Sequence, residues 1–219
     1  MTLKILFLLS AIVVTSGCVG LPPRVDPYSG LLPAGKVREV VQENMTFSRA
    51  ELKRSTVYVV TGANFETYAA IWKETEQRNR GGNMAYNRED MARIYASWAP
   101  SLTTTRLAEV LRRYFKEVEV VSDLAQAQTR NAQWIVMFDH ALEYPNPGAA
   151  NWINTTVVEL LDGKLMLFSK GEASVRNDYG LAWDHAQVMR NMDQHAKDVR
   201  AVADRALAVF EESLKRRFK

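Results

Sequence analysis

Three histidines are the residues of this chain whose side chains could bind a metal ion or transfer a proton. His140, His185 and His195 each stand beside or near an aspartate. Two or three histidines with a carboxylate can bind zinc if the fold brings them together. No two of them are four residues apart, the spacing that places both ligands on one face of a helix. We therefore expect no metal site and no bound cofactor.

Motifs for nucleophilic catalysis and for phosphate binding are missing from the sequence. No Gly-x-Ser-x-Gly turn is present, and Thr61 to Asn64 lacks the second glycine and the lysine of a phosphate-binding loop. Gly163-Lys164 reads as part of a hairpin. We therefore expect no catalytic residues and a non-enzymatic protein, with a hydrolase as the third-ranked alternative.

Cys18 is the only cysteine, and it follows a segment with three recognisable parts. Lys4 precedes an apolar run from Ile5 to Val14, and small residues precede Cys18. An apolar run of about ten residues is too short to span a bilayer, and this order of parts is typical of a secretory signal. The sequence predicts that residues 1–17 are a signal peptide that is removed.

The end of this signal resembles the lipobox of bacterial lipoproteins, with Ser16-Gly17 directly before Cys18. The resemblance implies cleavage before Cys18, lipid attachment to its sulfur, and a membrane anchor with more than one acyl chain. Val19 stands where aspartate would imply retention at the inner membrane. The resemblance therefore implies the periplasmic face of the outer membrane. The alternative is an ordinary signal peptide followed by a free or buried cysteine.

Composition indicates a globular protein and argues against nucleic acid as a partner. The chain is 47% hydrophobic and 24% charged, and its formal net charge is only +3. Removing Lys4 with the signal lowers that charge by one. Basic residues gather at Lys215 to Arg217, where the end of a helix favours cations; a polyanion or lipid-headgroup site is the alternative.

Proline distribution divides the mature chain. Pro22, Pro23, Pro27 and Pro33 lie in residues 18–34, which we interpret as a lipidated, extended tether. Residues 35–219 are expected to form a single periplasmic domain.

Apolar periodicity predicts the elements of that domain. We expect strands at Thr56–Val60, 118–121 and Trp134–Phe138, the last buried on both faces. Helices are predicted after caps at Asn64, Asn87 and Ser101, and a long C-terminal helix from Asp193. Asp162-Gly163 predicts a type I′ hairpin between strands that cover residues 155–175.

Together these elements predict an α/β (α+β) fold, with a mixed, partly antiparallel sheet packed against helices. A helical insertion is expected at about residues 64–98. The half from Ser101 onward resembles small periplasmic lipoprotein domains: the amino-terminal domain of the Tol translocation protein, the curli secretion lipoprotein and auxiliary lipoproteins of ABC-type transporters. The matching stretches are Leu107–Leu111, Val118–Ser122, Ala132–Val136 and Val157–Leu165. The resemblance implies a non-enzymatic partner in envelope assembly or transport.

One loop has the composition of a protein-binding surface. Tyr144, Pro147 and Trp152 place aromatic rings beside prolines, as partner interfaces often do; the alternative is that Trp152 covers the sheet edge. The leading hypothesis is a lipid-anchored accessory or scaffold protein that binds envelope proteins. The alternative is a periplasmic carrier or sensor that binds a small or lipidic ligand.

Overall fold

The fold is built on one five-stranded mixed sheet. The computed structural model describes residues 23–30, 48–80, 88–143, 151–178 and 184–217. The strand order is β2-β1-β3-β4-β5. The strands are β1 (Thr56–Thr61), β2 (Glu117–Val120), β3 (Trp134–Glu143), β4 (Asn151–Asp162) and β5 (Leu167–Asp178). β1 pairs in parallel with β2 and β3, whereas β3, β4 and β5 pair antiparallel. The predicted α/β class with a mixed, partly antiparallel sheet is confirmed.

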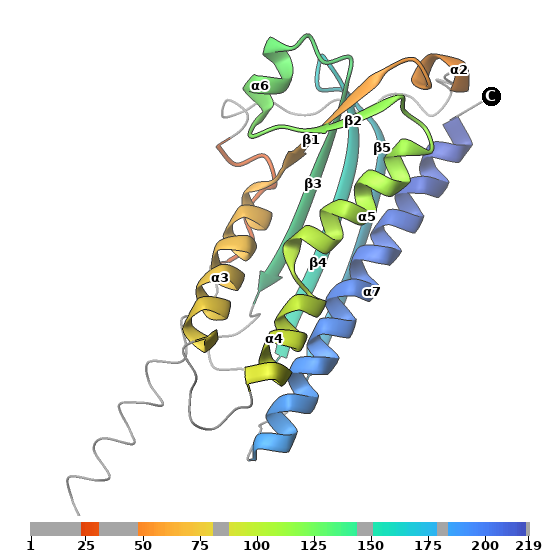
Figure 1. Cartoon of the computed structure of the whole chain (residues 1–219). Helices are drawn as coiled ribbons and strands as arrows, with labels where there is room; N and C mark the ends of the chain where they lie inside the picture. The colour runs from red at the N-terminus through yellow and green to blue at the C-terminus, as the bar shows by residue number, and fades with distance from the viewer. Residues whose placement is uncertain (1–22, 31–47, 81–87, 144–150, 179–183, 218–219) are drawn as a thin grey trace, which may run out of the picture.

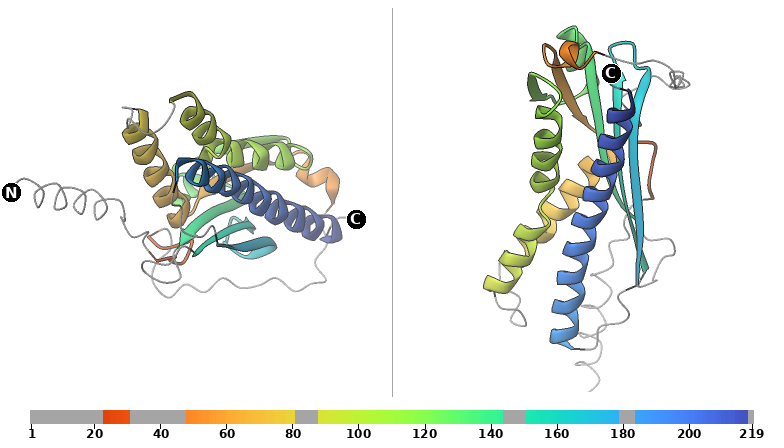
Figure 2. Two further views of the ribbon diagram at one scale, coloured as in Figure 1. Left: turned by 90° about the horizontal axis from the view of Figure 1, so that it is seen from below. Right: turned by 90° about the vertical axis from the view of Figure 1, so that its right-hand side faces the viewer.

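Helices form a layer on one face of this sheet (Figures 1 and 2). They are α3 (Ala63–Arg80), α4 (Arg88–Ser97), α5 (Pro100–Arg112) and α7 (His185–Arg217). The main core lies between them and the sheet and includes Val136, Leu111 and Phe210. Two shorter helices, α2 (Arg49–Leu52) and α6 (Leu124–Thr129), lie at the end of the molecule where β3 begins (Figure 1).

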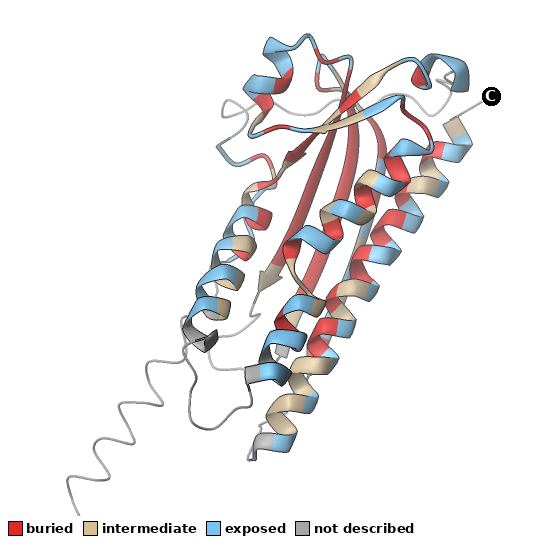
Figure 3. Ribbon diagram, viewed as in Figure 1, coloured by how far each residue is buried: buried red, intermediate tan, exposed pale blue. Residues whose placement is uncertain are grey.

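Burial follows the predicted apolar stripes. β3 is buried over its first eight residues and lies in the middle of the sheet (Figure 3), as the run Trp134–Phe138 predicts. The expected stripes of α5 and α7 lie in the core, with residues Leu107, Val110, Leu111, Tyr114, Val199, Val202, Ala206, Phe210 and Leu214 buried. Val209 is the exception, because it is 47% exposed. In the expected insertion, Phe65, Tyr68, Ile94 and Tyr95 are buried, so α3 and α4 complete the core.

Several predicted element ends are wrong. α5 begins at Pro100, with Ala99 as its non-helical N-cap, so Ser101 is not the cap. α7 begins eight residues before Asp193, and its neighbour β5 extends to Asp178. Between β4 and β5 the positive φ falls on Leu165 instead of the Asp-Gly pair of a type I′ turn. The Asp162 carboxylate accepts hydrogen bonds from the Lys164 and Met166 N–H groups, which stabilises this longer turn. The expected cap at Asn87 lies outside the described residues.

Gly171 allows α7 to lie directly on β5. A Cβ at this position would collide with the carbonyl oxygen of Ala206 and would lie 2.5 Å from the backbone nitrogen of Phe210. Both atoms belong to the helix backbone, which has no side-chain rotamer with which to move away. The absence of a side chain on Gly171 therefore allows the short distance between α7 and β5.

Candidate functional site

Polar residues gather in the second half of β3, on both faces of the sheet. Asp139 and His140 are neighbours on this strand, and alternation along the strand points their side chains to opposite faces. Both are buried, at 1% and 2% exposed. Buried polar groups need partners, and the partners of these two residues define the site.

Asp139 caps helix α3 from the neighbouring strand. One carboxylate oxygen accepts the backbone N–H of Phe65 at 2.8 Å, and the other accepts a hydrogen bond from the Asn64 side-chain amide at 2.7 Å. Gly62 leaves the space for this carboxylate, because a Cβ there would lie 2.5 Å from it. Burial raises the pKa of Asp139, while the bonds from Asn64 and Phe65 act in the opposite direction.

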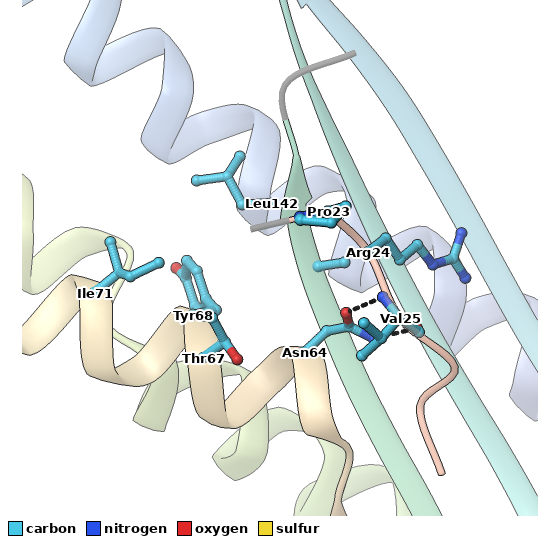
Figure 4. A pocket seen from close by; sticks show the side chains of 9 residues that line it. Pro23, Arg24, Val25, Asn64, Thr67, Tyr68, Ile71 and Leu142 are labelled. Atoms are coloured by element: carbon cyan, nitrogen blue, oxygen red, sulfur yellow. Dashed lines mark hydrogen bonds between the residues drawn. The ribbon is translucent and has the colours of Figure 1, made fainter. Parts of the chain in front are cut away.

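Asn64 is not the helix cap that the sequence predicts; it binds the chain near its beginning. Its amide oxygen accepts the Val25 N–H at 2.9 Å, and its amide nitrogen donates to the Val25 carbonyl at 2.9 Å (Figure 4). The Ala63 N–H donates to the Pro27 carbonyl at 3.0 Å. These bonds hold Pro23–Gly30, which we call the N-terminal strap, against the domain.

The strap continues across the sheet face opposite the main helix layer. Tyr28 is only 4% exposed, and its hydroxyl donates to the buried Glu159 carboxylate at 2.6 Å. Glu159 also lies 3.7 Å from the Lys170 ammonium, and Arg24 lies 3.4 Å from Glu172. Within residues 18–34, which we interpret as a tether, residues 23–30 therefore contact the folded domain. The proline content of this segment does not predict its hydrogen bonds to the domain or the burial of Tyr28.

His140 lies on the helix-covered face in an aromatic environment. Its Nδ1 lies 2.8 Å from the Thr156 hydroxyl, and the Tyr68 ring meets it edge-on at 4.6 Å between centroids. Its Nε2 has no hydrogen-bond partner among the described residues. Burial lowers the pKa of His140 to about 4, so the ring is neutral at physiological pH.

His195 approaches the same region from α7. Its ring contacts Trp98 and Trp152, each at 4.8 Å between centroids. Burial lowers its pKa to about 3, and repulsion from a charged His140 acts in the same direction. We call His140, His195, Tyr68, Trp98 and Trp152 the histidine–aromatic cluster. It stabilises the layer between the sheet and helices α3, α4 and α7.

The other predicted site residues are placed only in part. Trp152 is half-buried in the histidine–aromatic cluster, whereas Tyr144 and Pro147 lie outside the described residues, as does Cys18. No side-chain position is described for His185. In the part of the chain that the structure covers, no group of three or more metal-ligating side chains comes together. None of the helices described there is long and apolar enough to cross a bilayer.

A small pocket of about 70 Å³ opens between the strap, α3 and the end of β3 (Figure 4). Its walls include Pro23, Val25, Asn64, Tyr68, Ile71 and Leu142. The sequence contains only one hint of this site, the Asp139-His140 pair at the end of a buried strand. It contains no local signal for Tyr28, because Tyr28 meets Glu159 across 131 residues of chain.

Comparisons with known proteins do not assign the chain to a family. No family model matches the chain, and no curated protein matches it. Among solved structures, two of a PelC dodecamer from Paraburkholderia phytofirmans are 13% identical to it. They cover 78% and 80% of this chain and 90% and 92% of the other, with TM-scores of 0.34 and 0.35. A minor lipoprotein from Acinetobacter baumannii is 10% identical and covers 70% of this chain and 93% of its own, with a TM-score of 0.22. We draw no functional conclusion from likeness at this level.

Proposed function

We propose that this protein is a lipid-anchored, non-enzymatic accessory or scaffold protein of a bacterial envelope assembly or transport complex. Its anchor is the lipid on Cys18, and it lies at the periplasmic face of the outer membrane. The observation that carries the proposal is the order of features at the amino end. A secretory signal leads to the only cysteine, and five residues later the chain enters the fold as the strap.

Among the described residues, the buried polar side chains are poorly suited to acid–base catalysis. Asp139 is bonded to Phe65 and Asn64, and the two buried histidines are held neutral inside the histidine–aromatic cluster. A general base has to reach its substrate and needs a pKa near the working pH. His140 and His195 meet neither requirement, and the Asp139 carboxylate already serves as a helix cap.

Cross-linking in intact membranes followed by purification of the full-length protein tests the scaffold role. We expect one envelope protein to be recovered in a fixed ratio to the wild-type chain. The Cys18→Ala variant should lose both this partner and membrane partitioning, since the proposed acyl chains supply the attachment. A variant that still partitions with membranes would rule out the anchor, and a wild-type chain recovered alone would rule out the scaffold.

The pocket favours a second candidate, a carrier or sensor of a small or lipidic ligand. Tyr68, Ile71 and Leu142 give it apolar walls, and Pro23 and Val25 of the strap also line it. Native mass spectrometry of the purified protein should then show a co-purified small molecule. Ile71→Trp, which fills the pocket, should lose that molecule, while a change at the exposed Ala208 of α7 should keep it.

A further inference from the structure

The strap limits how far the domain can stand from its membrane. Only five peptide steps separate Cys18 from Pro23, the first described residue of the strap. A fully extended chain covers at most about 3.6 Å per residue, so the Cα atom of Pro23 lies within about 18 Å of the Cα atom of Cys18. The expected long tether would have released the domain from this constraint.

The strap cannot lengthen the reach while its bonds to the domain persist. Asn64 binds both backbone groups of Val25, and three residues further on Tyr28 is buried against Glu159. Arg24 and Glu172 add an ion pair at the surface. Releasing the strap would take these partners from Asn64 and Glu159, and unmet hydrogen bonds of buried groups are costly.

The strap begins beside the carboxyl end of β3, and α4 and the first turns of α7 extend beyond that point (Figures 1 and 2). Pro23 shares the pocket with Leu142, at the carboxyl end of β3. α7 begins near this end, where His195 meets Trp152 at the start of β4, and runs away from it (Figures 1 and 2). Its 33 residues extend about 50 Å at 1.5 Å per residue, so its last turns lie far from the strap.

We infer that the anchored protein stands with the carboxyl end of β3 toward the bilayer and the carboxyl end of α7 away from it. The surface around Pro23, Thr67 and Ala70, all exposed, then faces the lipid headgroups. This orientation rests on the proposed lipid anchor. In this orientation, the carboxyl ends of α5 and α7 form the surface most accessible to a partner in the periplasm.

Charge at the remote end opposes this orientation. Arg112, Lys215 and Arg216 are exposed there, and they would be drawn to anionic lipid. At physiological ionic strength the Debye length is about 8 Å, so this attraction fades within a short distance. The covalent restraint of the short Cys18–Pro23 connection is not screened, and we expect it to decide the orientation.

Energy transfer from the protein to the bilayer tests the inference. Acylation of Cys18 leaves no other thiol, so single cysteines can be labelled in the full lipidated chain. Ala70→Cys on α3 and Ala208→Cys on α7 are a matched pair, since both alanines are exposed on helices. The vesicles contain phosphatidylethanolamine, phosphatidylglycerol and an acceptor-labelled lipid, with a second set made of phosphatidylcholine alone as the uncharged control.

We expect transfer efficiency at Ala70→Cys to exceed that at Ala208→Cys by at least about twofold in both vesicle types, given the length of α7. Asn64→Leu and, as a milder change, Tyr28→Phe weaken the strap and should reduce this ratio. Equal or reversed efficiencies in chains that float with the vesicles would overturn the orientation while leaving the anchor intact. Chains that do not float with the vesicles would overturn both.

Discussion

Among single residues, Asn64 contributes most to holding the strap against the domain. Its amide donates to the Val25 carbonyl and to Asp139, and its oxygen accepts from the Val25 N–H. Only an amide both donates and accepts here, so neither a carboxylate nor an alkyl group replaces it.

Asn64→Asp should therefore destabilise the protein more than Asn64→Ala. Alanine loses the hydrogen bonds, at a cost of about 1–3 kcal/mol for the buried partners left unpaired. Aspartate in addition places a second carboxylate beside Asp139, and like charges in a buried site repel. Urea unfolding at pH 7 measures both free energies; equal stability of the two variants would show that Asn64 and Asp139 do not interact as described.

The histidine–aromatic cluster predicts a dependence of stability on pH. Both histidines have a pKa in the folded protein, about 4 and about 3, below the ordinary value of 6.5. Between pH 6.5 and 4 the unfolded chain binds protons that the folded chain does not. Stability should thus be full above pH 6.5 and fall as the pH is lowered, by up to about 3 kcal/mol for His140 and about 5 kcal/mol for His195 once the pH is below both folded-state pKa values.

His195→Phe provides the check, because phenylalanine keeps an aromatic ring between Trp98 and Trp152 without a titrating group. The variant should lose roughly half of the decline in unfolding free energy between pH 6.5 and 4.5. Asp139 contributes equally to both proteins and cancels from the comparison. An unchanged pH profile in the variant would mean that His195 is accessible to solvent in the folded protein.

At the scale of elements, the close contact of α7 with β5 is the most sensitive packing feature. Gly171→Ala should lower the free energy of unfolding by about 1–3 kcal/mol, because the added methyl group meets helix backbone. Gly30→Ala is the control: Gly30 has φ 78 and open space around it, so the control should show only the conformational cost of about 1 kcal/mol. Thermal unfolding of both variants is the measurement, and a Gly171→Ala protein as stable as the control would contradict the packing.

Strands and helical stripes could be predicted from the sequence because they depend on local periodicity. The run Trp134–Phe138 and the α5 stripe around Leu107 and Leu111 needed no knowledge of distant residues. Helix ends were more difficult to predict. The residue that caps α3 is Asp139 on another strand, and the sequence around Asn64 contains no sign of this contact. The start of α7 was missed because residues 185–192 carry a weak apolar pattern, of which Val188, Met189 and Met192 are only half-buried.

The strap could not be predicted at all, for a physical reason. Prolines indicate an extended backbone, and an extended backbone is equally suited to a free tether and to a segment that pairs with a folded domain. The difference depends on whether the domain offers hydrogen-bond partners to the segment, as Asn64, Glu159 and Glu172 do here. These residues lie 39 to 148 residues along the chain from their strap partners.

At the scale of the whole molecule, the proposed lipid anchor at Cys18 lies only five residues before the strap. In the proposed orientation, the pocket lies toward the membrane and the last turns of α7 lie away from it. Binding of an envelope partner at the remote end would keep that partner at a set height above the bilayer.

The intact mass of the protein extracted from membranes tests the central claim most directly. The account predicts a chain of residues 18–219 carrying the added mass of more than one acyl chain on Cys18, and a Cys18→Ala protein without that mass. A mature chain that starts elsewhere, or one with a free thiol at Cys18, would contradict the lipid anchor and with it the orientation and the proposed role.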